Sequence, residues 1–306
     1  MTRAAPVSSR PARAVVTGGA GFIGSHLVDR LLAEGCAVLV VDDLSTGTLA
    51  NLPPGVEIER ADIATADLEA ALGAWRPHVV FHLAAQASVL FSHRDPLRDL
   101  AVNLVGTHRV AAAARSAGAG RLVFVSSGGA IYGESRSPAT ERRVPAPASH
   151  YGVHKLAAEG HVRLAGLPAA ILRPSNVYGP RQGAGLEGAV IAAFVDQAMR
   201  GGEIRIHGDG AQTRDFIHVQ DVVEALWTVG GSDAPDGTWN VATGRSVSIA
   251  ALADRVEEVL GRPIVRVHGP RRPGDVDSSA ISAAALRRLG WRPTIDLAAG
   301  LAELLR

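Results

Sequence analysis

Cysteine is nearly absent from the sequence, with Cys36 the only one among 306 residues. A single thiol cannot form a disulfide within the chain, and so few cysteines suit a reducing compartment. An excess of one charge is missing too, because 31 Lys and Arg residues face 30 Asp and Glu residues, for a net charge of +1. The composition therefore gives no reason to expect a nucleic-acid partner or an anionic membrane surface.

Long hydrophobic runs are also missing. No segment approaches the roughly 20 apolar residues that cross a bilayer, and the opening MTRAAPVSSRPAR has no apolar signal core. We therefore expect no membrane partner, a flexible tail over residues 1–12 and a cytoplasmic protein. The sequence predicts no metal site.

What the sequence does contain is a regular alternation of short apolar runs and longer helical patterns. In SHLVDRLLAEG, for example, Leu27, Leu31 and Leu32 share one helical face and Gly35 is a stop signal. This alternation predicts an α/β fold, a parallel sheet covered by helices on both faces. The strands are expected at 14–17, 37–43, 56–59, 79–85, 121–127 and 169–174.

The pattern changes after about residue 175, where Gly, Pro and polar residues become dense. We expect a smaller second domain there, with helical stretches at 189–200 and about 248–261. One segment, near WNVAT (239–243), is expected to return to the sheet. The predicted division is 13–174 plus about 214–243 for the first domain, and 175–213 plus about 244–306 for the second.

The stretch TGGAGFIG (17–24) follows the first strand and opens a helix. Its glycines allow a tight turn and bring main-chain N–H groups close to a phosphate. Asp42 ends the next strand, where an acidic residue bonds the adenosine ribose and repels a 2′-phosphate. The pattern predicts NAD rather than NADP; an ordinary strand–helix turn with a surface aspartate is the alternative.

Tyr151 and Lys155 form a Y-x-x-x-K pair inside a helical stretch, which places both side chains on one face. A free tyrosine, with a pKa of about 10, is a poor base at neutral pH. A nearby ammonium and a positive nicotinamide ring favour its phenolate, so Tyr151 is a candidate general base for an alcohol under oxidation. Read alone, the pair is more often two surface residues.

The glycine turn and the Tyr151–Lys155 pair belong to a longer series of motifs. In chain order the series is TGGAGFIGSHLVDRLL, DDLSTG, HLAAQ, AVNLVGT, YGVHK, RPSNVYGPRQ, GDGAQTRDFIHVQD, RRPGDV and LGW. In this the chain resembles the extended short-chain dehydrogenase/reductases of the nucleotide-sugar epimerase/dehydratase group, and most of all the UDP-sugar 4-epimerases. The resemblance implies a Rossmann-type doubly wound sheet with a smaller C-terminal α/β domain that binds a UDP-sugar. It also implies NAD as cofactor and a homodimer formed through the helices at 97–117 and 150–165.

The implied reaction inverts C4 of a UDP-sugar through a transient 4-keto sugar. Related dehydratases and decarboxylases carry an acidic residue two places before the tyrosine of the Y-G pair, where this chain has Ala130 before Tyr132. Epimerisation needs no such acid, so the segment SSGGAIYG favours the epimerase. A dehydratase, decarboxylase or reductase of the same family, or a non-catalytic NAD sensor, remains the alternative.

The same segment departs from the 4-epimerases at one place. Gly128 stands where many of them have the serine or threonine that touches the substrate 4-OH. We assign that role to Ser127, with Ser126 as the second candidate. The alternative is that both serines only cap the end of a strand.

The resemblance also implies the binding residues. Those for the cofactor are Gly18, Gly21, Phe22, Ile23, Gly24, Asp42, Asp43, Leu44, Ser45, Thr46, Gly47, Asp62, Ile63, Leu83, Ala84, Ala85, Asn103, Ser126, Tyr151, Lys155 and Pro174. Those for the substrate are Ala87, Ser127, Tyr151, Asn176, Arg181, Val190, Ile206, His207, Arg214, Arg272, Asp275 and Ser279.

Several substrate residues have a specific implied role. Asn176, Arg214 and Arg272 are expected to hold the diphosphate, Asp275 the uridine ribose, and Ile206 with His207 the uracil. Ser279 replaces a bulky tyrosine found in members restricted to UDP-glucose and UDP-galactose, which leaves room for a 2-acetamido group. UDP-glucose, UDP-GlcNAc and UDP-glucuronic acid all stay open, with Arg181 the candidate cation for a uronate.

Overall fold

The computed structural model describes residues 11–184, 189–271 and 276–306, the side chain of Arg136 excepted. Its strands are β1 Arg13–Thr17, β2 Ala37–Asp42, β3 Glu57–Arg60, β4 Val79–His82, β5 Arg121–Val125, β6 Ser135–Ala139, β7 Ala169–Pro174, β8 Asn176–Tyr178, β9 Ile204–His207, β10 Thr213–His218, β11 Gly237–Val241, β12 Ser246–Ser248, β13 Arg266–Gly269 and β14 Ser279–Ile281. Its helices are α1 Phe22–Ala33, η1 Leu49–Asn51, α2 Leu68–Trp75, α3 Val89–Arg94, α4 Pro96–Leu100, η2 Ala101–Gly106, α5 Thr107–Ser116, α6 Gly128–Ile131, α7 His150–Arg163, α8 Val190–Met199, α9 Val219–Gly230, α10 Ile249–Leu260, α11 Ala284–Arg288 and α12 Leu297–Leu304.

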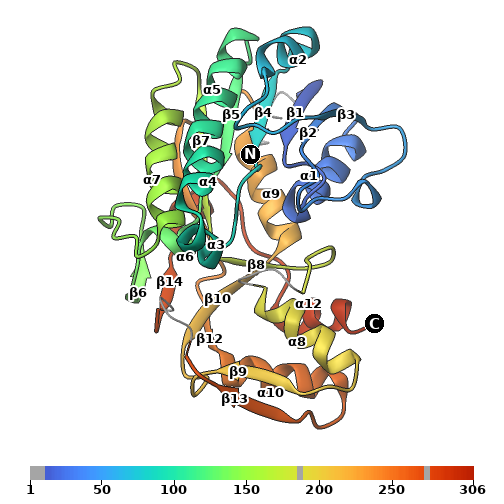
Figure 1. The fold of residues 1–306 in the computed structure, drawn as a ribbon, viewed down its shortest axis with the longest axis vertical. Helices are drawn as coiled ribbons and strands as arrows, with labels where there is room; N and C mark the ends of the chain where they lie inside the picture. Colours follow the sequence, from blue (N-terminus) through green and yellow to red (C-terminus); the bar gives the residue numbers. More distant parts are fainter. Residues whose placement is uncertain (1–10, 185–188, 272–275) are drawn as a thin grey trace, which may run out of the picture.

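Seven strands form one parallel sheet in the order β11-β7-β5-β4-β1-β2-β3. Helices α1 and α9 pack on one face, and α5 and α7 on the other (Figure 1). The central strands are apolar throughout because both of their faces are covered; every residue of β5 is buried. The expected Rossmann-type sheet is confirmed, and each predicted strand lies within about a residue or two of its place, apart from the overlong ends at 83–85 and 126–127.

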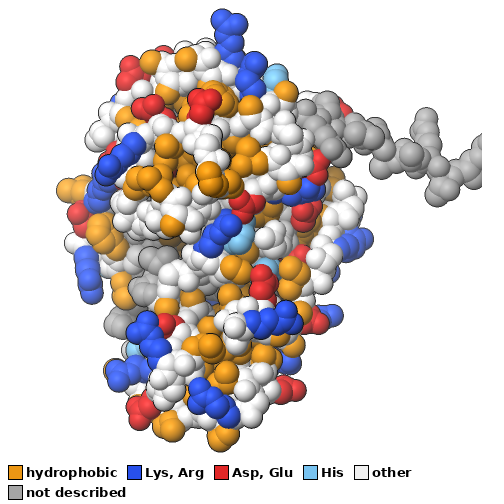
Figure 2. All heavy atoms as spheres, turned by 90° about the vertical axis from the view of Figure 1, so that its right-hand side faces the viewer, with side chains coloured by type: hydrophobic (Ala, Val, Ile, Leu, Met, Phe, Trp, Pro, Cys, Tyr) orange, Lys and Arg blue, Asp and Glu red, His pale blue; other side chains and the backbone are white. Residues whose placement is uncertain are grey.

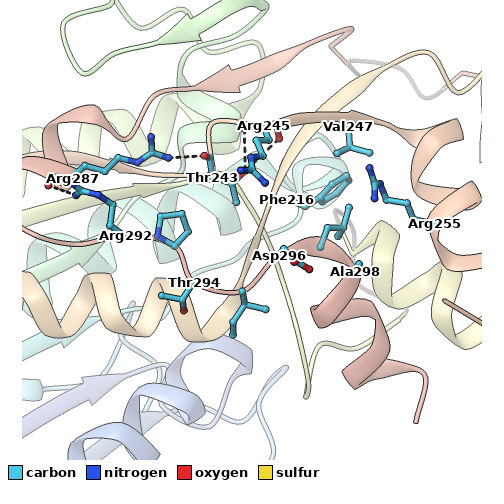
Figure 3. A pocket seen from close by; sticks show the side chains of 13 residues that line it. Phe216, Thr243, Arg245, Val247, Arg255, Arg287, Arg292, Thr294, Asp296 and Ala298 are labelled. Carbon is cyan, nitrogen blue, oxygen red and sulfur yellow. Dashed lines mark hydrogen bonds between the residues drawn. The ribbon is translucent and has the colours of Figure 1, made fainter. Parts of the chain in front are cut away.

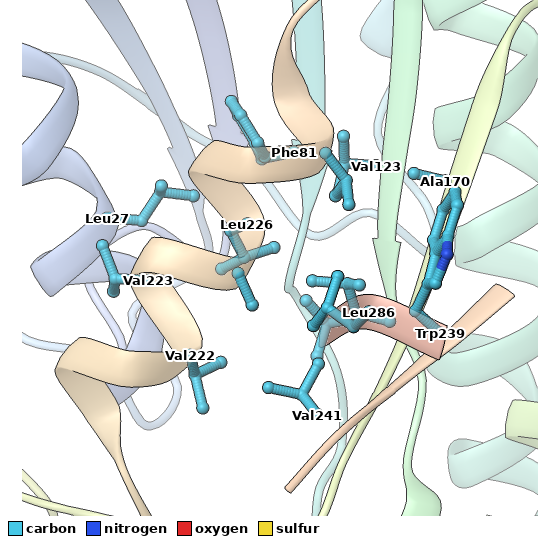
Figure 4. Close-up of a cluster of buried hydrophobic side chains, with 14 of the residues drawn as sticks. Leu27, Phe81, Val123, Ala170, Val222, Val223, Leu226, Trp239, Val241 and Leu286 are labelled. Carbon is cyan, nitrogen blue, oxygen red and sulfur yellow. The ribbon is translucent and has the colours of Figure 1, made fainter. Parts of the chain in front are cut away.

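Helix α9 packs its apolar side chains on one face of the large sheet. Its Val222, Val223 and Leu226 belong to one buried cluster with Phe81 and Val123 of the central strands (Figure 4). Burying side chains of this size stabilises the fold by about 1.5–3 kcal/mol each. The opposite face has a second apolar cluster, from α2, α5 and α7.

The remaining elements lie beyond the carboxyl ends of the large sheet (Figure 1). They include a three-stranded sheet, β12-β10-β8, and the two-stranded pairs β13-β9 and β14-β6. Helices α8, α10 and α12 pack there around an apolar cluster of their own. Strand β10 belongs to this small sheet, whereas α9 packs on the large sheet and β11 joins it. The chain therefore returns to the large sheet after His218, and the predicted two-domain division stays a prediction.

The helix expected over 97–117 is divided. Five residues of α4 lead into a π-helical turn, η2, and then into α5. Such turns inside helices are frequent at functional sites, and η2 carries Asn103.

Surface charges are mixed. Acidic and basic side chains are interspersed over the face drawn in Figure 2. Among the described residues, no helix has the length and apolar character to cross a membrane, and no group of three or more His, Cys, Asp or Glu residues is arranged to hold a metal ion.

Candidate active site

The glycine turn between β1 and α1 is closely packed. Gly18 has φ +71°, and a Cβ there would lie 2.6 Å from the amide nitrogen of Ala84. A Cβ on Gly24 would lie 2.1 Å from the carbonyl oxygen of Gly18. Gly21 precedes α1 and provides no side-chain cap for the helix. The first N–H groups of α1 are therefore available to bind an anion. We call this glycine turn and the start of α1 the cradle, and it is the arrangement that binds a dinucleotide phosphate.

Asp42 stands at the end of β2 and connects the two loops that border this cradle. Its Oδ2 accepts from the Ala20 amide and its Oδ1 from the Leu44 amide, each at 2.9 Å. Burial raises the pKa of its carboxyl group, and these two amides oppose the shift. A carboxylate has acceptor capacity beyond two bonds, so Asp42 suits ribose hydroxyls and disfavours a 2′-phosphate.

The other predicted cofactor residues follow the ends of neighbouring strands. Asp43–Gly47 follow β2, and Asp62 with Ile63 follow β3; Asp62 pairs with Arg98 at 2.9 Å. Leu83–Ala85 follow β4, where Asn103 Nδ2 donates to the Gln86 carbonyl at 2.8 Å and holds this loop. In such folds the crevice beyond the carboxyl ends of the strands is the dinucleotide site. The cradle and Asp42 fit NAD.

A cavity of about 340 Å³ lies beside this crevice, and we call it the catalytic cavity. Tyr151, in the first turn of α7, faces it together with Ser127 and Ala130. Burial raises the pKa of Tyr151 to about 12, a hydrogen bond with Ser127 lowers it, and the charge of Asp99 raises it. In this structure Tyr151 is therefore a protonated phenol, and it needs a positive group close by to act as a base near pH 7.

Lys155, one turn further along α7, is the only lysine in the chain. Its Nζ donates to the Val125 carbonyl at 2.6 Å and lies 4.2 Å from the centroid of the Phe124 ring. Burial lowers the pKa of Lys155 to about 7, against smaller opposing effects of Glu159 and Asp99. The side chain can therefore exchange a proton near neutral pH, which suits a partner of the tyrosine base.

The pKa of this lysine can be measured without ambiguity. With lysine labelled at ¹³Cε, the protein gives a single lysine signal, and we expect its pH titration to have a midpoint near 7. The unfolded chain keeps the same proton up to about pH 10.4. It therefore binds more protons than the folded protein above pH 7, so the free energy of unfolding should rise with pH from 7 towards about 9. A midpoint above about 10, the ordinary lysine value, would contradict this environment.

The two serine candidates have different surroundings. Ser126 Oγ donates to Glu159 Oε1 at 2.7 Å, and Glu159 is itself paired with Arg173 at 2.6 Å. This buried network holds the Ser126 hydroxyl. Ser127 lines the catalytic cavity next to Tyr151, so the geometry favours Ser127 for contact with a sugar hydroxyl.

The structure brings about half of the predicted substrate residues to the catalytic cavity. Its described lining includes no Asp or Glu side chain, and Arg214 is its one cation. The predicted residues that line it are Ala87, Ser127, Tyr151, Asn176, Arg214 and Ser279.

Of the other predicted substrate residues, the four that the structure describes do not line it: Arg181, Val190, Ile206 and His207. Arg181 forms an ion pair with Asp29 of α1 at 2.8 Å, and its assignment as a cation for a uronate stays a prediction. Val190 begins α8, and Ile206 with His207 ends β9. Arg272 and Asp275 lie outside the described residues.

Sequence reasoning missed a buried cluster beneath the cavity. Asp99 is fully buried and lies 2.5 Å from Nδ1 of His154, on the same helix as Tyr151 and Lys155. Gln86 and Asn103 also donate to Asp99. The cluster ties α7 to the loop after β4 and places a carboxylate near the base. The histidine before Lys155 was visible in the sequence, but its partner is 55 residues away.

Comparison with known proteins shows the family to which this sequence is similar. The model of the NAD dependent epimerase/dehydratase family matches residues 14–242. The chain is 42% identical to the UDP-glucose 4-epimerase of Mycolicibacterium smegmatis, over 95% of this chain and 96% of that one.

Two solved structures are also similar. The UDP-glucose 4-epimerase of Thermus thermophilus in complex with NAD has a TM-score of 0.92 at 39% identity, over 96% of this chain and 97% of that one. The UDP-N-acetylglucosamine 4-epimerase of Methanobrevibacter ruminantium, in complex with UDP-N-acetylmuramic acid, has a TM-score of 0.90 at 34% identity, over 97% and 98%.

Proposed function

The chain belongs to the NAD dependent epimerase/dehydratase family, and from this premise we propose that it inverts C4 of neutral UDP-hexoses, UDP-glucose and UDP-GlcNAc. It is an isomerase, an NAD-dependent UDP-sugar 4-epimerase. The observation that carries the proposal is the catalytic cavity, where Tyr151 and Ser127 lie together and the described lining holds no carboxylate. Dehydration and the related chemistry at C5 and C6 need such an acid.

The chain's own groups account for the proton transfers. Tyr151 takes the proton of the sugar 4-OH, and Ser127 is hydrogen-bonded to Tyr151. Lys155, four residues away on α7, supplies a positive charge that favours the phenolate form of Tyr151. NAD, when bound, accepts hydride from C4 and returns it. Asn176 and Arg214 hold the diphosphate end, so the 4-keto sugar can present its other face while C4 stays in reach.

The cavity also supports a neutral sugar. Arg181, the cation proposed for a uronate, is bound to Asp29. Ser279 is 4% exposed, and its hydroxyl has no hydrogen-bond partner among the described residues. A hydroxyl or an acetamido group of the substrate can supply that partner, and the small side chain leaves space for the larger of the two.

Proton NMR of reaction mixtures tests the proposal. The purified protein is incubated separately with UDP-glucose, UDP-GlcNAc and UDP-glucuronic acid, first without added NAD. We expect the C4 epimers of the two neutral sugars and little change in the uronate. A decarboxylated or dehydrated product would contradict the epimerase, and no reaction with NAD supplied would favour a non-catalytic NAD sensor.

We further propose a homodimer formed by α5 and α7, which pack side by side. Val105 and His108 continue one exposed stripe along η2 and α5, and Val153, His161 and Leu164 form another along α7 and its end. His108 and His161 touch across the two helices, with ring centroids 5.2 Å apart. Helix pairs with exposed apolar stripes of this kind pack in bundles.

A charge placed in this stripe should separate the dimer. Val153 is 47% exposed on α7, and Val153→Glu would bring like charges together at the proposed interface. We expect the wild type to have twice the chain mass in light scattering after size exclusion, and the variant to shift to the chain mass. Val265→Glu, at a residue 62% exposed in the small-sheet region, is the control. A monomeric wild type would refute the proposal.

A further inference from the structure

A second cavity, of about 600 Å³, lies in the region of the small sheet. It is bounded by β10, β12, α10 and the chain that joins α11 to α12 (Figure 3). Arg245, Arg255, Arg287 and Arg292 line it, and we call it the arginine cavity. Figure 3 shows Arg287 and Arg292 on one side and Arg255 on the other. The two cavities share no lining residue.

The charge of the arginine cavity is unbalanced. None of the ion pairs among the described residues includes any of its four guanidinium groups. Arg287 donates to the Thr243 carbonyl at 2.7 Å, and Arg292 donates to backbone carbonyls. Among the described residues of the lining, the one carboxylate is Asp296, which caps α12 by accepting from the Ala299 amide at 2.8 Å. Four positive side chains thus meet one negative side chain, in a chain whose net charge is +1.

Three carboxylates on the surrounding elements have other partners. Asp254 and Glu257 of α10 pair with Arg266. Asp215 of β10 accepts from Thr243 and Gly244. In addition, the buried Nε of Arg287 has no acceptor among the described residues. A buried donor without an acceptor is unfavourable, so an anion that accepts a hydrogen bond from this Nε would remove that cost.

The rest of the lining is largely apolar, with Phe216, Val247, Pro293, Ile295 and Leu297 beside the arginines. Guanidinium groups bind phosphate oxygens in pairs through their planar fork. We propose that the arginine cavity binds a polyphosphate group, as carried by a nucleoside triphosphate, whose base packs on the apolar part. The volume of about 600 Å³ is within the range of small-molecule sites.

Calorimetric titration of the NAD-loaded protein with inorganic tripolyphosphate and, separately, with GTP tests this proposal. Arg255→Glu reverses one charge of the cavity, and we expect it to weaken both ligands at least tenfold. Arg205→Glu makes the same change at an exposed residue of β9 outside the lining and should change the affinity less than twofold. A thermal melt of each variant confirms folding.

The outcomes separate the possible sources and sites. If GTP binds more tightly than tripolyphosphate, the base contacts the apolar part of the cavity and the ligand is a nucleoside triphosphate. If the two affinities are equal, the base contributes nothing and the ligand is free polyphosphate. Arg214→Ala, in the catalytic cavity, should leave both titrations unchanged. Loss of binding in Arg214→Ala would place the ligand at the UDP-sugar site and overturn the proposal, as would equal effects of the Arg255 and Arg205 variants or no binding at millimolar ligand.

Discussion

Tyr151→Phe should lower kcat for UDP-glucose by about 10²–10⁴-fold, the range that a general base contributes, with little change in KM. The variant removes one hydroxyl and keeps the ring, so the packing of α7 is preserved. In the catalytic cavity of the variant, no phenol oxygen remains to take the proton of the sugar 4-OH. The measurement is the initial rate of UDP-galactose formation at saturating substrate.

Neighbouring serines supply a matched comparison. Ser127→Ala should lower kcat by roughly 5- to 13-fold, as loss of a hydrogen bond worth about 1–1.5 kcal/mol implies. Ser126→Ala breaks its bond to Glu159, so we expect it to reduce stability more than turnover. If Ser126→Ala lost activity and Ser127→Ala kept it, the assignment of the two serines would be reversed. If Tyr151→Phe kept full activity, the proposed base would be wrong.

Ser279→Tyr should change which sugar is accepted. A phenol ring at this buried position of β14 takes space from the cavity of about 340 Å³. Overfilling a packed site costs about 1–3 kcal/mol, so kcat/KM for UDP-GlcNAc should fall about 10- to 100-fold. We expect kcat/KM for UDP-glucose, which has only a hydroxyl at C2, to stay within a few-fold of wild type.

The ratio of the two kcat/KM values is the informative quantity, because it cancels a general loss of active protein. Ser279→Ala is the control; it keeps the position small and should leave the ratio near that of the wild type. An unchanged ratio in a folded Ser279→Tyr variant would show that this residue does not face the C2 substituent.

The large sheet was predictable because its inner strands are buried on both faces and read as short apolar runs bounded by glycine and polar residues. The small sheets were not, since β8, β12 and β14 have three residues each and depend on partners far along the chain. Within the site, the glycine turn and the Tyr151–Lys155 pair are local patterns, so residue spacing alone located them.

The rest of the site could not be predicted because the sequence does not show in which direction a side chain points. Ser126 and Ser127 are adjacent in extended backbone, where successive side chains point to opposite sides, and only the position of Glu159 decides which side each faces. Arg181 was placed by its nearness in sequence to the substrate motif. Its backbone has φ +66°, and its side chain pairs with Asp29 of a helix more than 150 residues earlier in the sequence.

Inversion of C4 through a 4-keto sugar can be tested with UDP-glucose deuterated at C4. We expect the hydrogen removed from C4 to be the one that returns, so the UDP-galactose formed in ordinary water should keep its deuterium at C4 in the NMR spectrum. Loss of that deuterium to the solvent would mean that C4 is inverted by proton abstraction, without a 4-keto sugar.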